Sequence, residues 1–525
     1  MPSGRTIPDA DPAVRWLWWA LVLITLWRLW AAWVLPVTQD EAYYFNWALS
    51  LDWGYFDHPP GVALLGLGAR LVPSSALAGR LGNLLAATLT LLVLIRFYRL
   101  CGLDTRQQVL ALVVTSATFA GLVSGVLATP DTPLALAWAL ALHEGLAALR
   151  QDRRRWVTAG LVTGLGLLGK YGMVLMGPVF LWAILWADPK ALRTPWPYLG
   201  ALMALVFFAP NLIWNAQNDW LSIRFQFGHG FSTSTGANPT DPVGAALTLP
   251  QRTSELEQAD LGARLLAVLS FLGIQAAFWG LMLFPLVAGL WRGARGRIQA
   301  SPLVHDRAAR ALLLAGTAFP LAFFGLVAAF STVQPNWALL YLLTGIPLAL
   351  LATEGYHRAL LGAAGANVLL VSLYVLHARI GILPLPDSQQ RILHETHGFQ
   401  ALAREVQRLS GPVFANRYQL VAMTRFYAPG LAITQWPGPF RASEYLRGRI
   451  APPVDREWIA RAGGFWLLSR DPPWAVIPGF RLDRQRLLYD CPKEGLREVI
   501  AGQPDPCAEP LHRWWLLYYV SDPSA

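Results

Sequence analysis

The sequence predicts a mainly α-helical polytopic membrane protein with a smaller external α/β domain at its C-terminal end. Of the 525 residues, 54% are hydrophobic and only 14% are charged, whereas a soluble globular protein carries about a quarter charged residues. Apolar segments of about 20 residues, long enough to cross a bilayer, recur up to residue 378. After Arg379 the composition becomes mixed, as in a domain that faces water. The 24 Trp residues suit a chain that meets two membrane interfaces.

The apolar segments predict eleven membrane spans. They lie at roughly 14–36, 80–98, 107–128, 132–149, 156–170, 172–187, 196–214, 263–291, 308–331, 336–353 and 357–377. The stretch 156–187 is long for one span and short for two. Basic sequences, RQDRRR and DPKALR, precede and follow it. Because basic loops stay in the cytoplasm, the chain is expected to cross the membrane twice between them.

The distribution of basic residues also predicts the orientation. Basic residues gather in alternate loops, which places those loops and the N-terminus in the cytoplasm. The loops that hold Asp40, Asp131 and Gln334 are poor in Lys and Arg, so they are expected outside together with the C-terminus. The first apolar segment is too long for the core of a signal peptide, so we expect a retained span. Cytoplasmic loops explain the formal net charge of +10, and no nucleic-acid partner is expected.

Two domains are expected. Residues 1–378 form the transmembrane domain, with external loops at 38–79 and 215–262, and residues 379–525 form the external domain. In the external domain, GFWLLS and WWLLYYV are short apolar runs typical of strands, and QALAREVQRL is typical of an amphipathic helix.

The chain has three cysteines. Cys491 and Cys507 both fall in the external domain, where oxidation is permitted. They are expected to form either a disulfide or two buried free thiols. Cys101 lies at a cytoplasmic helix end and is expected to be an inert thiol.

Acidic and aromatic residues concentrate in the first external loop, TQDEAYYFNWALSLDWGYFDHPP. Asp40 and Glu41 stand where the first span ends, and a carboxylate pair at that depth is costly unless it faces water or a cavity. Neighbouring like charges raise the pKa of one member, which suits a general base. The alternative is that Asp40 caps the following helix while the helix dipole favours Glu41. Tyr55, Asp57 and His58 are typical of a sugar-binding wall, with an interfacial aromatic belt as the alternative.

The segment DEAYYFNWALSLDWGYFDHPPGVALL closely resembles the first external loop of the GT-C membrane glycosyltransferases. The nearest branch contains the RgtA/B/C/D-like glycosyltransferases, the lipid A aminoarabinose transferases and the protein O-mannosyltransferases. Four later segments resemble family segments in the same order: ATPDTPLALAW, GLGLLGKYGMVL, PNLIWNAQNDWLSIRFQFGHG and VQPNWALLYL. The resemblance covers roughly residues 14–350, and the external domain resembles family members only loosely.

The resemblance implies an enzyme that moves a sugar, with inversion, from a polyprenyl-phosphate donor to a glycolipid, lipopolysaccharide or polysaccharide acceptor. It would act on the periplasmic face of a bacterial inner membrane, with the donor, the acceptor and membrane lipids as partners. Asp40 would be the catalytic base and Glu41 would orient the acceptor. The residues implied in substrate binding are Tyr55, Asp57, His58, Asp131, Lys170, Tyr171, Asn215, Arg224, His229, Asn336 and Trp337.

Some of these roles have structural alternatives. Lys170 is the first candidate to hold the donor phosphate, because an ionisable residue within a span is functional by default. It could equally reach the interface from a hairpin between two short helices. Asp131 could instead cap the fourth span. Arg224 and His229 are the other candidates for the phosphate. From the external domain, Tyr418 and its neighbour Arg417 are weaker candidates to reach over the site.

No cofactor is predicted with certainty. Asp40, Glu41, Asp131 and His58 could together bind a divalent cation, although no ligand spacing demands one.

The sequence leaves two functions open besides transfer of a sugar to a glycolipid or polysaccharide. A protein O-glycosyltransferase would keep the fold and change the acceptor. A transporter or flippase for lipid-linked sugars would usually show internal repeats and sites at the membrane midplane, whereas the acids here gather at one face and no repeat is detected.

Overall fold

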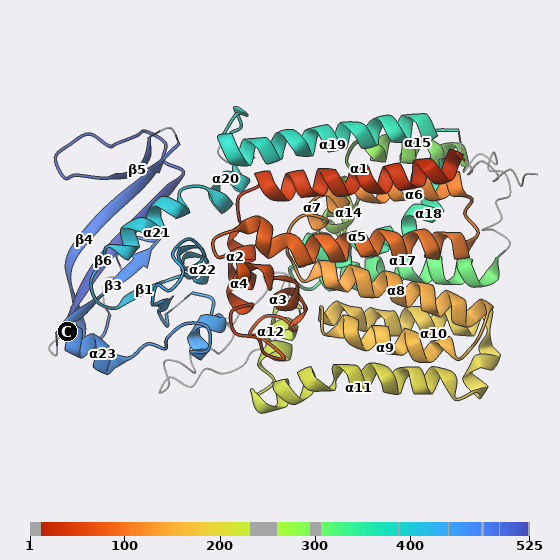
Figure 1. Ribbon diagram of the computed structural model, residues 1–525, viewed down its shortest axis with the longest axis horizontal. Coiled ribbons are helices and arrows are strands. Elements are labelled where there is room, and N and C mark those ends of the chain that lie inside the picture. Colours follow the sequence, from red (N-terminus) through yellow and green to blue (C-terminus); the bar gives the residue numbers. More distant parts are fainter. Residues whose placement is uncertain are drawn as a thin grey trace, which may run out of the picture.

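The computed structural model describes residues 12–230, 260–293, 306–353, 355–386, 389–438, 440–473, 477–492 and 494–522. Figure 1 shows long helices that run side by side, with a β-sheet and its own helices beyond one end of them. The short helices of the first external loop lie at that same end of the bundle (Figure 1), and one of them, α2, packs against α22 of the sheet domain. The acidic loop is therefore held between the two parts of the molecule.

The membrane part contains helices of very different lengths. They are α1 (Pro12–Val34), α2 (Gln39–Trp47), α3 (Gly61–Leu65), α4 (Gly68–Leu71), α5 (Ala76–Cys101), α6 (Thr105–Ala117), α7 (Phe119–Ser124), α8 (Asp131–Arg150), α9 (Arg155–Leu167), η1 (Tyr171–Leu175), α10 (Met176–Ala187), η2 (Pro189–Arg193), α11 (Trp196–Gln217), α12 (Leu221–Gly230), α14 (Leu261–Ala277), η3 (Gly280–Met282), α15 (Leu283–Gly293), α17 (Arg307–Ala328), η4 (Pro335–Ala338), α18 (Tyr341–Ala352) and α19 (His357–Ile380).

Within the described residues, six helices are individually long and apolar enough to cross a membrane: α1, α5, α8, α11, α17 and α19. A bent pair, α14 with η3–α15, makes seven when it is counted as one span. The other predicted spans coincide with helices that are too short to span alone: α6 with α7, α9, η1 with α10, and α18. Short helices are tolerated where they line protein rather than lipid. The predicted fold class, a helical membrane protein with a C-terminal sheet domain, is confirmed.

The predicted span 263–291 is not one straight helix, because the chain bends by 102° between α14 and η3. Gly280 at the bend has a positive φ of 59°, a conformation that glycine adopts readily. The buried side chain of Asn367 satisfies the backbone groups that the bend releases. Its Oδ1 accepts the Leu281 N–H at 2.8 Å, and its Nδ2 donates to the Trp279 carbonyl at 2.9 Å. Such a break is stable only where protein groups complete the hydrogen bonds.

The C-terminal part is a mixed α/β domain, as predicted. Its helices are α20 (Arg391–Thr396), α21 (Phe399–Gln407), α22 (Tyr418–Tyr427), η6 (Glu444–Arg447) and α23 (Arg456–Ala462), and its strands are β1 (Val413–Ala415), β2 (Ile433–Gln435), β3 (Gly464–Ser469), β4 (Phe480–Cys491), β5 (Gly495–Glu498) and β6 (His512–Ser521). The sheet has the order β2-β1-β3-β6-β4-β5. Strand β1 is parallel to β2 and β3, and the remaining pairs are antiparallel.

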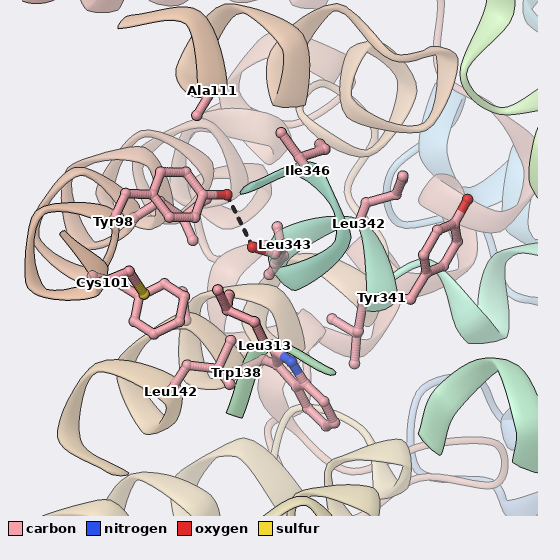
Figure 2. Packing of buried hydrophobic residues seen from close by; sticks show 14 of the residues in the cluster. Tyr98, Cys101, Ala111, Trp138, Leu142, Leu313, Tyr341, Leu342, Leu343 and Ile346 are labelled. Atoms are coloured by element: carbon pink, nitrogen blue, oxygen red, sulfur yellow. Dashed lines mark hydrogen bonds between the residues drawn. The ribbon is translucent and has the colours of Figure 1, made fainter. Parts of the chain in front are cut away.

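The core of the membrane part is packed from several helices (Figure 2). Tyr98 of α5, Trp138 and Leu142 of α8, Leu313 of α17 and Leu343 of α18 are all buried there. The Tyr98 hydroxyl donates a hydrogen bond of 3.0 Å to the Leu343 carbonyl, so its polar group is satisfied in an apolar interior.

The structure contains the Cys491–Cys507 disulfide, and Cys101 is a buried free thiol. Thiol labelling of the denatured, unreduced protein is therefore expected to find one free thiol per chain, and three after reduction. In the chain-entropy model, a bridge that closes so short a loop contributes roughly 3 kcal/mol to stability. Replacing both cysteines by Ser should lower the free energy of unfolding of this domain by about that amount. Three reactive thiols before reduction would contradict the assignment.

Candidate active site

A polar cavity of about 280 Å³ lies where the first external loop meets the helix bundle and the C-terminal domain. Its wall comes from α2, the loop after α2, the start of α8, the turn before η1, α12, η4, α22 and the loop after β2. Eight of the residues expected to form the site or to reach over it line this cavity: Asp40, Asp57, His58, Asp131, Lys170, Asn336, Trp337 and Tyr418. Residues separated by up to 378 positions in the sequence, from Asp40 to Tyr418, thus converge on one cavity.

Among the described residues, Asp40 is the carboxylate of the cavity that has no basic side chain bonded to it. It lies in the first turn of α2 and accepts a hydrogen bond of 3.3 Å from the Tyr418 hydroxyl. The helix cap belongs to Thr38, whose side chain accepts the Glu41 N–H, so the alternative role of Asp40 as the cap is not needed. Burial among protein atoms raises the pKa of Asp40, although Arg441 and Tyr418 oppose the shift. The side chain remains open to the cavity.

A second carboxylate, Asp131, is fully engaged by neighbours. Its two oxygens accept hydrogen bonds from the Lys170 ammonium at 2.6 Å and from the Asn336 amide at 2.7 Å. Asp131 is the first residue of α8, Lys170 lies between α9 and η1, and Asn336 belongs to η4. The pairing fixes the Lys170 ammonium at the cavity wall, since a charge-assisted hydrogen bond is both short and directional.

The C-terminal domain adds a second cation, Arg441, which the sequence did not single out. Its guanidinium forms an ion pair with the buried Asp57. It also lies 4.7 Å from the centre of the Tyr418 ring and 4.9 Å from that of Phe225. These contacts hold Arg441 in the wall of the cavity, between the first external loop and α12.

Glu41 does not face the cavity, although it follows Asp40 directly. Its fully buried carboxylate accepts hydrogen bonds from the Arg80 guanidinium at 2.7 and 2.6 Å. It also accepts the backbone N–H groups of Ala128 at 2.9 Å and Thr38 at 3.1 Å. Because successive residues of a helix point about 100° apart, the two acids take different directions. Glu41 joins α2 to α5 and to the chain before α8.

Other residues implied by the resemblance also pack within the protein. The Tyr55 ring stacks on Trp47, and its hydroxyl lies within hydrogen-bond distance of two backbone carbonyl acceptors, those of Trp47 and Ser50. Asn215 is buried and donates to Tyr171 and to Asn211. Neither Tyr55 nor Asn215 lines the cavity. Their positions therefore do not support the prediction that they bind substrate there.

Two further residues were predicted as candidates to bind the donor phosphate, Arg224 and His229. Arg224 has an exposed side chain and does not line the cavity. The side chain of His229, in the last turn of α12, falls outside the described residues, as does most of the predicted external loop 215–262.

An apolar pocket of about 280 Å³ adjoins the polar cavity. Lys170, Gln226 and Trp337 line both spaces. Tyr171, one of the expected site residues, lines the apolar pocket together with side chains such as Phe208. A charged cavity thus borders an apolar space, which is an arrangement suited to a ligand with a polar head and an apolar tail.

The residues considered for a divalent metal do not converge as a ligand set. Glu41 is bound by Arg80, and both oxygens of Asp131 are occupied by Lys170 and Asn336. In the part of the chain that the structure describes, no group of three His, Cys, Asp or Glu side chains could hold a metal ion. We therefore derive no chemical step through a metal.

Known proteins match the chain in fold and in part of the sequence. Residues 57–214 match the family described as dolichyl-phosphate-mannose-protein mannosyltransferase. The lipid A galacturonosyltransferase RgtD of Rhizobium johnstonii is 30% identical over 192 residues, which are 35% of this chain and 40% of RgtD. The crystal structure of ArnT from Cupriavidus metallidurans in the apo state superposes with a TM-score of 0.59 and 14% identity, covering 97% of this chain and 98% of ArnT.

These matches identify the fold. The chain is a membrane protein with the GT-C fold, and its resemblance to the GT-C membrane glycosyltransferases is confirmed. The sequence match to RgtD spans less than half of that relative.

Proposed function

We propose that the chain is a glycosyltransferase that transfers a sugar from a polyprenyl-phosphate donor to a glycolipid acceptor, with Asp40 as general base. The observation that carries this proposal is the position of Asp40. In the part of the chain that the structure describes, it is the carboxylate of the polar cavity that no cation binds, while Asp131 and Asp57 hold Lys170 and Arg441 in the wall of the same cavity. A base must be free to accept a proton, and a leaving phosphate needs cations.

The two adjoining spaces support a donor with a lipid tail. The apolar pocket accommodates the first part of a polyprenyl chain, and the shared residue Lys170 stands where the phosphate would follow. Arg441 provides a second cation on the opposite domain. Each cation is held in place by a carboxylate, so neither needs to be ordered at the moment of reaction.

The reaction follows from these positions. Asp40 takes the proton of an acceptor hydroxyl or amine, and the acceptor atom attacks the anomeric carbon from the side opposite the phosphate. The bond between that carbon and the phosphate oxygen breaks, and the electron pair leaves with the polyprenyl phosphate, whose charge Lys170 and Arg441 stabilise. A single in-line displacement inverts the anomeric configuration.

The acceptor is proposed from the relative RgtD, whose name describes transfer to lipid A. A glycolipid in the outer leaflet of a bacterial inner membrane would present its sugars at the same depth as Asp40, which follows directly after the first span. The positive-inside rule supports a site on the periplasmic side. A protein acceptor is the second candidate, because the family that matches residues 57–214 is described as acting on protein.

A product assay separates these acceptors. The purified protein is incubated with a panel of polyprenyl-phosphate sugars and with lipid A or an acceptor peptide, and the products are weighed by mass spectrometry. We expect lipid A to gain the mass of one sugar residue. A sugar found on the peptide alone would replace the glycolipid by a protein acceptor.

The raised pKa of Asp40 predicts the pH dependence of the reaction. The base works only when it is deprotonated, and burial raises its pKa above that of an ordinary aspartate. The value of kcat/KM should therefore fall on acidification through an apparent pKa higher than that of an ordinary aspartate, and it should level off at higher pH. A profile that stays flat down to the ordinary carboxyl range would argue against Asp40 as the base.

Lys170 is expected to contribute through the donor phosphate. A hydrogen bond to a charged group is worth about 1.5–3 kcal/mol, so Lys170→Gln should lower kcat/KM by roughly tenfold to a hundredfold. Arg441→Gln should have a similar effect. Arg449→Gln is the control, since this exposed arginine pairs with Asp52 and does not line the cavity. Equal losses in all three variants would point to a general structural effect instead.

A further inference from the structure

A second feature lies far from the polar cavity, in a groove of about 460 Å³ between α1 and α5. The groove is lined by residues of the first turns of α1, including Leu17 and Trp18, and by the second half of α5. The end of α1 leads into the first external loop, and the start of α5 follows that loop. The groove therefore lies at the end of these helices that is opposite to the candidate active site.

The side chains of α5 in this groove are arranged in a gradient from apolar to basic. Five of these side chains each lie three or four residues from another member of the set, so they form one stripe along the helix. They are Leu89, Leu92, Val93, Arg96 and Arg99. With a rise of 1.5 Å per residue, the stripe is about 15 Å long. The apolar part lies deeper along the helix, and the two arginines lie near its end at Cys101.

The two arginines are exposed and have no carboxylate partner among the described residues. Nearby, Arg150 is different, because it pairs with Asp306 at 3.1 Å. Trp16 and Trp19, close to the start of α1, are 66% and 59% exposed, as expected for side chains at a membrane interface. Two exposed positive charges, without a carboxylate partner among the described residues, thus stand at one end of a mainly apolar groove.

We propose that this groove binds one anionic phospholipid. Its phosphate lies between Arg96 and Arg99, and an acyl chain follows Leu89 and Val93. Basic pockets between transmembrane helices bind anionic head groups in this manner. The lining is mainly apolar apart from the arginines, which favours a lipid over a free phosphate ion. The groove volume also falls within the range of small-molecule sites, roughly 300–1,000 Å³.

Such a lipid would join the two helices that position the first external loop. Arg80 of α5 binds the carbonyls of Ala32 and Leu35, near the end of α1, and also binds Glu41. A lipid that bridges the other ends of α1 and α5 should therefore raise the thermal stability of the protein. This inference is independent of the catalytic proposal.

The test uses the full protein in detergent and measures lipid retention by native mass spectrometry. Phosphatidylglycerol is compared with phosphatidylcholine, and inorganic phosphate is run as a third arm. We expect one tightly held phosphatidylglycerol, weaker retention of phosphatidylcholine and no effect of phosphate alone on the unfolding temperature. The variant Arg96→Gln/Arg99→Gln should weaken phosphatidylglycerol binding by about thirtyfold.

Two further variants complete the test. Lys190→Gln/Arg193→Gln removes two exposed charges from η2 and leaves the groove intact, so it should bind phosphatidylglycerol normally. Val93→Trp fills the groove and keeps both arginines, so it should also lose the lipid. Equal retention of the two lipids by the parent protein, or normal binding by both groove variants, would overturn the proposal. An equal loss of phosphatidylglycerol binding in the Arg96/Arg99 and Lys190/Arg193 double variants would indicate a nonspecific charge effect, and it would also overturn the proposal.

Discussion

Asp40→Asn is expected to slow sugar transfer by at least about a hundredfold while the protein still folds and inserts. Asparagine keeps the size of the side chain and can still accept the hydrogen bond from Tyr418, but it cannot take a proton from the acceptor. Loss of a general base typically costs a hundredfold to ten-thousandfold in rate. The loss should appear in kcat, because the variant keeps the groups that hold the donor phosphate.

Its matched control is the neighbouring acid of the first external loop, Glu41. Glu41 lies outside the cavity, so Glu41→Gln should act through stability and not through the pH profile of the reaction. Thermal unfolding of each variant separates the two effects. A well-folded Asp40→Asn protein with near-normal transfer would end the catalytic assignment and leave Asp131 as the next candidate.

Arg80→Leu is expected to lower the free energy of unfolding by about 3–5 kcal/mol, the usual effect of breaking a buried ion pair. The Arg80 guanidinium is fully buried and binds Glu41 as well as the carbonyls of Ala32, Leu35 and Pro36. Its removal leaves a buried carboxylate without its cation. It also loosens α2, which carries Asp40, so transfer should fall together with stability.

The double variant Arg80→Leu/Glu41→Gln tests the cause. If the unpaired charge is responsible, neutralising Glu41 should recover part of the unfolding temperature that Arg80→Leu loses. Arg193→Leu is the control, because it removes an exposed arginine of η2. An Arg80→Leu protein as stable as this control would show that the pair does not hold the loop in place.

The fold and the place of Asp40 in the polar cavity could be predicted from the sequence, because both depend on local patterns. Apolar segments revealed the helices, basic loops separated the two helices within 156–187, and the acidic loop pointed to Asp40. The bend near Gly280 was not foreseen, because it depends on Asn367, which lies 86 residues after the amide that it caps.

The division of roles within the site was also beyond local patterns. Asp40 and Glu41 are adjacent, and the sequence does not show that only Asp40 of this pair faces the cavity. The reason is a long-range contact, because Glu41 binds Arg80, which lies 39 residues later in the chain. Arg441 was missed for a similar reason. It is one of many arginines in the external domain, and only its contact with Asp57 across the two domains places it in the site.

The proposed inverting transfer is tested most directly by a single-turnover assay with a defined polyprenyl-phosphate sugar and lipid A, in which both products are measured. The parent protein should release one polyprenyl phosphate for each glycosylated lipid A, and the new glycosidic bond should have the inverted configuration. Asp40→Asn should form both products at least about a hundredfold more slowly. The proposed reaction would be contradicted if the parent protein released no polyprenyl phosphate, or if transfer retained the anomeric configuration.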